Sequence, residues 1–289
     1  MSGELELLEW IHGRLGRRGG AIVVDSGDDA AVLKFGRERL LFKVDTVVEG
    51  VHFRRGTPPE KIGYKALARP LSDIAAMGGV PVGALAAAVL PRSWPLDRAK
   101  RLQKGLERLH IPIVGGDIAT HRGPLSLSVS VIGDMKGVEP VLRSGARPGD
   151  LLVVTGTLGG SIRGKHLVFK PRLLEGRLFA TKSRVHAMID ISDGLARDLG
   201  HLCDASGVGA EIAAPRVPVA RGSTLAGALH DGEDYELLAA ADADAAWSIE
   251  RAGAGTIIGR ILPGRGLWIV STNGVRVPLK PLGFEHRLK

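Results

Sequence analysis

One segment of strict alternation, PLSLSVSVIGDM at residues 124–135, constrains the fold more than any other. Leucine and valine occupy every second position from 125 to 131, and serine occupies the positions between them. Successive side chains of a strand point to opposite faces, so the pattern predicts a strand with one packed face. The serine face then needs water or a partner surface. The chain therefore contains a sheet that its own helices cover on one side only.

Strand-length apolar runs alternate with helical periodicity along the rest of the chain, which is typical of a mixed α/β protein. The 289 residues are 44% hydrophobic, enough for one large core or two medium ones. We expect strands at residues 30–35, 40–48, 83–90, 111–117, 124–135, 150–157, 188–192, 235–241 and 256–262, and a hairpin at 267–279 around Asn273-Gly274. We expect helices at residues 4–15, 58–68, 96–110, 194–206 and 244–253, and a helical region between 158 and 180.

Two proline-containing stretches qualify this pattern. Pro70 lies inside the helical pattern that begins at Pro58, and we expect it to kink or interrupt the helix before LSDIAAMGG. The Gly/Pro-rich RSGARPGD at residues 143–150 indicates a domain boundary. We therefore expect an N-terminal α/β domain at residues 1–138 and a C-terminal α/β domain at residues 139–289.

Composition narrows the range of partners. Lys and Arg number 39 against 31 Asp and Glu, a net charge of +8 that favours anionic partners. No basic run is interleaved with aromatic residues and there are two tyrosines, so we do not expect nucleic-acid binding. No apolar stretch reaches the roughly 20 residues of a membrane span, and the acidic, amphipathic opening is unlike a signal peptide. The single cysteine, Cys203, fits a buried thiol in a reducing cytoplasm.

Acidic residues recur beside glycine or serine where strands end. The stretches are SGDDAAVL, KVDTVV, LSDIAAMGG, VGGDIA, ISDGL and DGEDYELL. Most of these acids have no Lys or Arg beside them in the sequence, although the chain is basic. Converging carboxylates raise one another's pKa unless cations lie among them, and hard oxygen ligands without His or Cys favour Mg²⁺ over zinc. The repetition therefore predicts metal-assisted phosphoryl transfer, whereas any one of these acids alone would be read as a helix cap or turn residue.

A second stretch resembles a phosphate-binding loop but departs from it. GGSIRGKH, residues 159–166, follows a strand and matches G-x-x-x-x-G-K-[ST] except at its last position. His166 cannot supply the hydroxyl that holds Mg²⁺ in that motif. We interpret the stretch as a glycine-rich turn into a helix, with Lys165 on the surface.

Taken together, the motifs resemble those of the thiamine-monophosphate kinases, members of the aminoimidazole ribonucleotide synthetase superfamily. The matching stretches run in family order from Gly27 to Leu238, and the closing PLGFEH resembles the family's C-terminal signature. They are GDDAAVL, VDTVVEGVHF, YKALA, LSDIAAMG, GGD, RSGARPGD, VTGTLGGS, IDISDGL and GEDYELL. The resemblance implies a homodimer of two-domain α/β chains with the aminoimidazole ribonucleotide synthetase-like fold. It also implies the use of ATP and several Mg²⁺ ions to phosphorylate thiamine monophosphate directly to thiamine diphosphate.

The resemblance further implies roles for individual residues. It implies metal ligation by Asp29, Asp45, Asp73, Asp117, Asp190 and Asp193, with Val44 offering its backbone carbonyl. It implies ATP contacts at Gly116, Asp117, Arg143 and Ser192. It assigns His52 and Glu233 to thiamine monophosphate. No residue stands out as a general base, because the attacking phosphate oxygen is already ionised and positioning with charge neutralisation suffices.

The chain departs from the family pattern at several points. The segment around residues 161–166 is shorter by about one helix and its loop, Pro70 replaces an asparagine, His230-Asp231 replaces Ser-Gly, and Pro281 stands where an aromatic residue is common. The alternatives are another ATP-dependent enzyme of the superfamily, such as a cyclo-ligase or a synthetase, and a catalytically impaired nucleotide-binding paralogue. The selenophosphate synthetase branch lacks support because the chain has no N-terminal reactive cysteine, and the hydrogenase-maturation branch because it has no C-terminal one.

Overall fold

The computed structural model describes residues 6–7, 10–11, 20–25, 27–181 and 184–285. Its first sheet has the strand order β1-β2-β3-β6-β4-β5, antiparallel throughout except for the β4–β5 pair. The strands are β1 (Ile22–Val24), β2 (Ala31–Phe35), β3 (Glu38–Val48), β4 (Val80–Pro91), β5 (Ile113–His121) and β6 (Ser126–Asp134). The predicted helix at residues 4–15 lies largely outside the described residues.

The second sheet has the order β13-β12-β9-β11-β7-β10-β8, with β9 and β12 parallel. Its strands are β7 (Leu151–Val154), β8 (Val185–Ile191), β9 (Gly209–Ala213), β10 (Glu236–Ala241), β11 (Thr256–Leu262), β12 (Gly266–Val270) and β13 (Arg276–Pro278). The helices are α2 (Pro59–Ala76), α3 (Leu96–Glu107), α4 (Leu173–Thr181), α5 (Leu195–Ser206), α6 (Leu225–His230) and α7 (Ala243–Arg251). The predicted α/β class with mixed sheets and the β12–β13 hairpin are confirmed.

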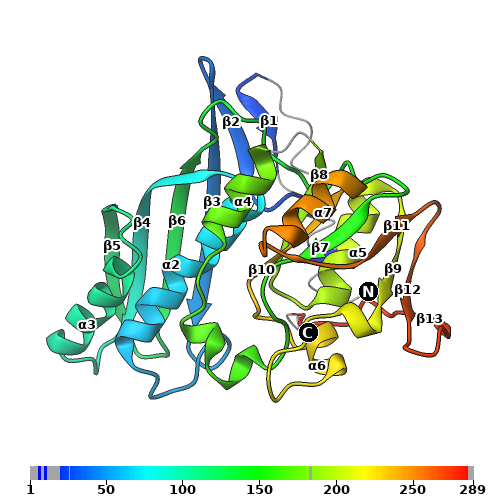
Figure 1. Ribbon diagram of the computed structural model, residues 1–289. Helices are drawn as coiled ribbons and strands as arrows, with labels where there is room; N and C mark the ends of the chain where they lie inside the picture. The colour runs from blue at the N-terminus through cyan, green and yellow to red at the C-terminus, as the bar shows by residue number, and fades with distance from the viewer. Residues whose placement is uncertain (1–5, 8–9, 12–19, 26, 182–183, 286–289) are drawn as a thin grey trace.

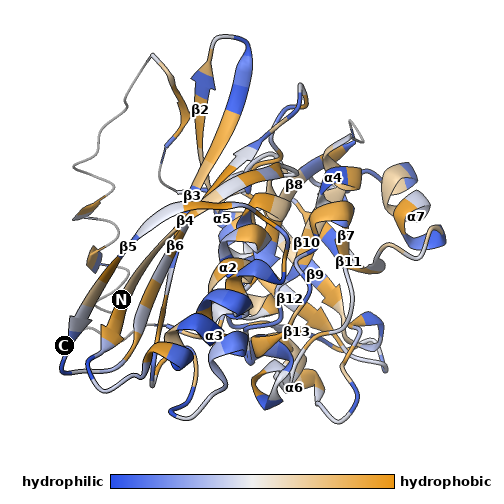
Figure 2. Ribbon diagram, turned by 90° about the vertical axis from the view of Figure 1, so that its left-hand side faces the viewer, coloured by the Kyte–Doolittle hydropathy of each residue, from blue (hydrophilic) through white to orange (hydrophobic). Residues whose placement is uncertain are grey.

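The two sheets are covered differently. In the second sheet, all six residues of β10 are buried, because α5 and α6 pack on one face and α4 and α7 on the other. In the first sheet, α2 and α3 lie on one side of the strands (Figure 2). On the opposite face, Val44, Val82 and Leu85 are about half exposed, and Thr46 and Ser128 share a hydrogen bond of 2.8 Å. The prediction that β6 alternates between a packed and an uncovered face is confirmed.

Helix α2 runs between the two sheets and belongs to both cores (Figure 1). Ile62, Leu67 and Leu71 are fully buried against the first sheet. At the end of the helix, Ala75 and Ala76 pack into the cluster formed by the second sheet with α4 and α7. A single helix therefore fixes how the two halves of the chain sit against each other.

Of the kink or interruption predicted at Pro70, the interruption is wrong. Helix α2 continues from Pro59 through Pro70 to Ala76. Proline removes one main-chain hydrogen bond and crowds the preceding turn, which costs about 3 kcal/mol in an isolated helix. Here Ala68, Pro70 and Leu71 are buried, so tertiary packing outweighs that local cost.

Three other boundaries differ from the sequence expectation. Strand β5 does not end at Gly115-Gly116 but continues to His121, because β4 pairs with it along its whole length. The expected helical region before Ala180 contains two short 3₁₀ turns, Ser161–Arg163 and Lys165–Leu167, and then α4. The elements β1, β9 and α6, and a 3₁₀ turn at Ala214–Arg216, were not predicted. They are short segments whose formation depends on tertiary neighbours.

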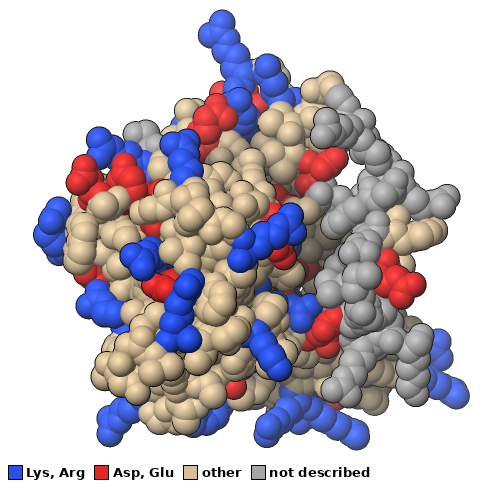
Figure 3. Space-filling view, turned by 90° about the vertical axis from the view of Figure 1, so that its right-hand side faces the viewer, with Lys and Arg blue, Asp and Glu red and all other residues tan. Residues whose placement is uncertain are grey.

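Surface charge and hydropathy add two observations. On the face seen in Figure 3, Lys and Arg are scattered among Asp and Glu rather than gathered into one stripe. No helix among the described residues combines the length and apolar character needed to cross a membrane.

Candidate active site

Three buried aspartates converge where the two halves of the chain meet. Asp29 lies two residues before β2, Asp73 in the last turn of α2, and Asp190 next to the end of β8. One carboxylate oxygen from each lies within 4.8 Å of the others, and the residues are 1%, 7% and 4% exposed. The predicted convergence of acids is therefore confirmed for these three, which come from distant parts of the chain.

The sequence around most of these acids contains no neighbouring Lys or Arg, but the fold brings cations to them. Lys43 Nζ on β3 lies 2.8 Å from Asp73 Oδ1 and 3.9 Å from Asp45 Oδ1. Arg143 Nη2 donates to Asp29 Oδ1 at 2.8 Å. Asp73 has no cation beside it in the sequence, but the packing of α2 against β3 brings in Lys43 from 30 residues earlier. Arg143, predicted to contact ATP, is likewise partly buried against an acid of the cluster.

The partners remain too few for the carboxylates. The Ser72 hydroxyl donates to Asp190 Oδ2 at 2.6 Å, but this bond brings no charge. Asp29 Oδ2 is buried and has no hydrogen-bond partner within the described part of the chain. Three buried acids thus face Lys43 and Arg143 directly, with the charge of Arg69 also acting on Asp73 and Asp45, and Asp45 adds a further negative charge near Lys43.

The pKa shifts follow from this imbalance. Burial, with the charge of Asp29 adding to it, raises the pKa of Asp190 from 3.8 to about 7. Burial also raises the pKa of Asp73 well above its usual value, with Lys43 opposing the shift and Asp45 and Asp190 reinforcing it. Burial alone would lower the pKa of Lys43, yet the charges of Asp73 and Asp45 raise it. Without metal, these carboxylates therefore bind protons more readily than ordinary aspartates do.

The donor set fits Mg²⁺. Carboxylate oxygens of Asp29, Asp73 and Asp190 are the hard ligands that this ion prefers, and no His or Cys belongs to this cluster of described residues. The unsatisfied oxygen of Asp29 supplies a free coordination position. A divalent cation would also relieve the repulsion that raises the pKa values.

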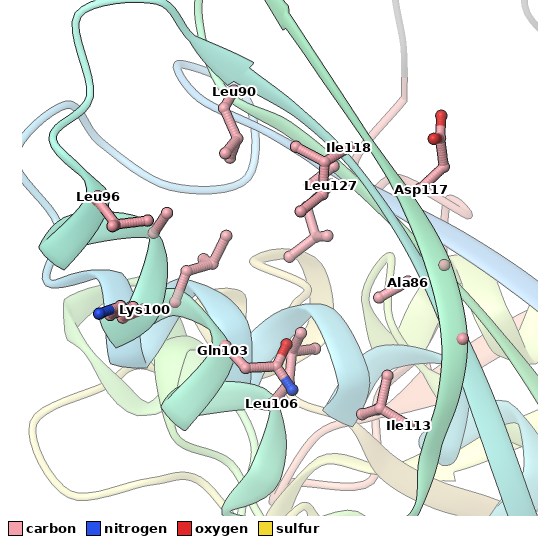
Figure 4. Close-up of a pocket in the computed structure, with 15 residues that line it drawn as sticks. Ala86, Leu90, Leu96, Lys100, Gln103, Leu106, Ile113, Asp117, Ile118 and Leu127 are labelled. Carbon is pink, nitrogen blue, oxygen red and sulfur yellow. The ribbon is translucent and has the colours of Figure 1, made fainter.

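Asp117 and Gly116 lie away from the three acids. In register, Asp117 pairs with Ala87 and Ala87 with Ser128, which places the Asp117 side chain on the uncovered face of the first sheet. The opposite side of β5, together with α3, lines an apolar cavity of about 650 Å³. Figure 4 shows Ile118 and Leu127 toward this cavity and Asp117 pointing away from it. At Gly116, an added Cβ would lie 1.9 Å from the Ala86 carbonyl oxygen, so only glycine fits there.

Asp193 belongs to a separate group at the start of α5. Its carboxylate lies within 4.8 Å of ligand atoms of Asp198 and His201, which sequence reasoning did not single out. Asp198 accepts hydrogen bonds from the backbone N–H groups of Asp193 and Gly194, at 3.0 and 3.1 Å. This carboxylate therefore stabilises the helix N-terminus. Ser192 lies next to this turn, and its carbonyl accepts from the Glu233 N–H at 2.7 Å.

His52 and Glu233 are joined through a lysine. Lys65 on α2 donates to the His52 carbonyl at 2.6 Å and forms an ion pair with the Glu233 carboxylate. Burial lowers the pKa of Lys65, and Glu233 opposes that shift. His52 is not a fully exposed loop residue, since its Nδ1 accepts a hydrogen bond from the Val48 N–H at 3.1 Å. The structure therefore brings together the two residues predicted to contact substrate.

The segment shortened relative to the family pattern forms one wall of a neighbouring cavity of about 310 Å³. Loop residues His52 and Arg54 line one side, and Arg163, His166 and Leu167 line the other. The segment is fixed by its own contacts, including the Ser161 hydroxyl donating to the Glu233 carbonyl at 2.6 Å. The cavity therefore has a basic, partly apolar lining.

The interpretation of Lys165 as a simple surface residue is wrong. Its ammonium lies 2.9 Å from Glu236 Oε1 and 2.9 Å from the Thr157 carbonyl oxygen. Arg172 binds both oxygens of the same buried Glu236, at 2.6 and 3.0 Å. Lys165 therefore neutralises a buried glutamate. Because its ammonium is already bound, this contact argues against a phosphate-binding loop in addition to the missing hydroxyl.

Sequence reasoning missed Lys43, Lys65 and Ser72 as members of the site. One signal was present for Lys65: it falls three residues after Ile62 and next to Ala66, on the apolar face of the helical pattern. A lysine on a buried face needs a partner, which marks it for inspection. Lys43 gave no comparable signal, because it lies on a strand of mixed polarity.

Comparisons with known proteins identify the family. Residues 27–135 match the model of the AIR synthase related protein N-terminal domain, and residues 147–270 that of the C-terminal domain. The chain is 34% identical over 309 residues to the thiamine-monophosphate kinase of Rhodopirellula baltica, covering 98% of this chain and 97% of the relative. It is 35% identical to that of Bacillus subtilis, covering 75% and 77%.

Solved structures give the same picture. AaThiL complexed with AMPPCP and TMP superposes with a TM-score of 0.84 at 30% identity, covering 98% of this chain and 97% of that one. The thiamine-monophosphate kinase of Stenotrophomonas maltophilia superposes with a TM-score of 0.74 at 33% identity, covering 93% and 97%. A HypE–HypF complex, at 18% identity and a TM-score of 0.74, shares the fold.

Proposed function

The chain belongs to the AIR synthase related family, among its thiamine-monophosphate kinases, and we propose on this basis that it phosphorylates thiamine monophosphate with ATP to give thiamine diphosphate. The observation that carries the proposal is the buried cluster of Asp29, Asp73 and Asp190, whose carboxylates face too few cations. The related AaThiL, solved with AMPPCP and TMP, supports both substrates.

The reaction is a direct phosphoryl transfer. A phosphate oxygen of thiamine monophosphate forms a bond to the γ-phosphorus of ATP, and the bond from that phosphorus to the β,γ-bridging oxygen breaks. ADP leaves with the electron pair. The attacking oxygen is already ionised, so no general base is needed, and the work of the protein is to position the reactants and neutralise charge.

We propose Mg²⁺ as the cation of the site. Asp29, Asp73 and Asp190 would hold it, and when bound it would neutralise charge on the transferring phosphates. Further ligands follow from the family resemblance: Asp45, the Val44 carbonyl, Asp117 and Asp193. Asp45 is supported by its place beside Lys43 in the same cluster of charges. Asp193 and Asp117 lie apart from the three acids, which supports several ions rather than one.

We propose that ATP contacts Gly116, Asp117, Arg143 and Ser192. Arg143 already faces Asp29, and its fork suits phosphate oxygens. Gly116 borders the apolar cavity beneath β5, which has room for a purine nucleoside, whereas the Asp117 side chain lies on the opposite face of the sheet. These contacts on β5 are separated from Asp45 on β3 by three strand spacings, about 14 Å.

A homodimer would resolve this separation. The uncovered face of the first sheet exposes Val44, Val82, Leu85, Val114 and Ile132, a patch suited to a second copy of the same sheet. One copy would then contribute Asp117 to a site near the interface. Light scattering at micromolar concentration checks the proposal, and a monomeric mass contradicts it.

Thiamine monophosphate would bind near His52 and Glu233. The basic, partly apolar cavity lined by His52, Arg54 and Arg163 supports an organic phosphate there. We further propose two domains, residues 1–138 and 139–289, each built around one sheet, and a location in the cytoplasm, which suits the buried free thiol of Cys203.

The test is product formation by the purified protein. ADP release is measured with ATP and Mg²⁺, with and without thiamine monophosphate, and thiamine diphosphate is quantified by chromatography. We expect one diphosphate per ADP, and ADP release that depends on thiamine monophosphate. ATP turnover that ignores thiamine monophosphate would point to another reaction of the superfamily. Nucleotide binding without turnover would point to an impaired paralogue.

A further inference from the structure

We infer that Lys65 is a positioning residue for thiamine monophosphate, holding His52 and Glu233 in one fixed arrangement; the inference rests on the proposed function. Lys65 is completely buried, so it does not meet substrate from solvent. Its ammonium instead contacts the His52 carbonyl at 2.6 Å and pairs with the Glu233 carboxylate. It thus links a loop of the N-terminal half to a loop of the C-terminal half.

The charge balance argues for a dedicated role. Burying an ammonium is unfavourable unless it is paired and hydrogen-bonded. Most buried core positions of this helix are filled by apolar residues such as Ile62 and Leu67, and an apolar residue at 65 would avoid that cost. Stability alone therefore does not explain a lysine here. The two groups it touches are both predicted substrate contacts, and positioning them does explain it.

The Glu233 loop is itself held in an unusual conformation. Glu233 has φ of 57° and Tyr235 has φ of 52°, a region that costs free energy for residues other than glycine. Neighbours fix the loop: the Glu233 N–H donates to the Ser192 carbonyl, and the Tyr235 ring stacks on Phe169 at 3.9 Å. Lys65 is the contact that aims the carboxylate itself. Without it, the backbone of the loop would stay while the Glu233 side chain lost its direction.

Helix α2 also sets the distance between this pair and the acids. Lys65 and Asp73 are eight residues apart on one helix, so about 12 Å of helical rise separates them. Ser72, at the same end as Asp73, donates to Asp190. The helix thus carries a substrate anchor at one level and the metal ligands two turns later. A rigid helix preserves this spacing in a way that two loops could not.

The test compares Lys65→Met with Lys61→Met, a matched control that removes an exposed lysine from the same helix. For Lys65→Met we expect the KM for thiamine monophosphate to rise at least tenfold, while the KM for ATP stays within twofold. Lys61→Met should match the wild type in both. Calorimetric binding of thiamine monophosphate to each variant should follow the same order.

The outcomes separate the inference from the proposed function. A wild-type protein that makes no thiamine diphosphate contradicts the proposed function itself. An active wild type with equal KM changes for both substrates in Lys65→Met reduces Lys65 to a structural residue. Should Lys65→Met fail to fold, Lys65→Arg decides: it keeps the charge, but its wider planar group fits the two acceptors poorly. We expect a three- to tenfold rise in the KM for thiamine monophosphate, and an unchanged value overturns the inference.

Discussion

Two positions on helix α2, Lys65 near its middle and Asp73 in its last turn, handle buried charge in opposite ways. At Lys65, the ammonium is matched by one carboxylate and one carbonyl, and the group is neutral as it stands. At Asp73, carboxylates from Asp29 and Asp190 converge, and Lys43 and Arg143 do not balance them. The charges around Lys65 are balanced within the protein, whereas the acidic end of the helix, at Asp73, needs cations from outside.

This difference distinguishes a group that positions the substrate from a group that holds the metal for phosphoryl transfer. A neutral, fully bonded pair stays in one arrangement and so suits a residue that orders substrate contacts. Carboxylates crowded together repel one another until a divalent ion binds, so this group of acids is suited to holding the ion. The predictions below aim to break this contrast, beginning with the largest expected effect.

Substitution at the acidic end should cost the most activity. Asp73→Asn keeps the side chain's shape but removes a formal charge from the metal shell. We expect a loss of roughly 100-fold or more in kcat at saturating Mg²⁺ and ATP. Steady-state kinetics measure it. Asp204→Asn, which changes an exposed aspartate on α5, is the control and should stay within twofold of the wild type.

The stability of the metal-free protein should fall as the pH rises. Asp190 has its pKa raised from 3.8 to about 7, so between these values the folded protein binds more protons than the unfolded chain. The contribution of Asp190 to stability is therefore largest near pH 3.8 and declines toward pH 7. We expect the Tm to drop by about 5 °C or more across it. Mg²⁺ should flatten the decline, because it stabilises the ionised carboxylates; a Tm that rises equally with and without Mg²⁺ would contradict the imbalance.

The smallest effect should come from Lys165. Arg172 keeps both oxygens of Glu236 occupied after Lys165→Ala, so the buried glutamate retains a cation. We expect a kcat within about tenfold of the wild type and a loss of about 1–2 kcal/mol in the free energy of unfolding. Kinetics and denaturant unfolding check both values. Abolished turnover in this variant, with Asp73→Asn still active, would mean that the phosphates bind at the glycine-rich turn instead.

Local patterns predicted much of the fold. The alternation in residues 124–135 gave both the strand β6 and its uncovered face, and helical spacing gave α3, α5 and α7. Pro70 shows the limit, because its local preference was outweighed by burial on both sides. The continuation of β5 beyond Gly116 depends on β4, a neighbour more than 20 residues away in sequence.

The candidate site was predictable in its acids but not in their partners. Asp29, Asp73 and Asp190 stand in motifs that repeat along the chain, so the sequence alone indicated them. Lys43 and Arg143 reach them only through sheet pairing and the packing of the two halves. The opposite faces occupied by Asp45 and Asp117 likewise follow from strand register, which motif spacing does not reveal.

Binding of Mg²⁺ to the acidic end tests the account most directly. Calorimetric titration, with a non-hydrolysable ATP analogue present, compares the wild type, Asp73→Asn and Lys65→Met. We predict that Lys65→Met binds Mg²⁺ like the wild type, whereas Asp73→Asn binds at least tenfold more weakly or loses an ion from the stoichiometry. Identical isotherms for Asp73→Asn and the wild type would contradict the claim that these buried carboxylates hold the metal.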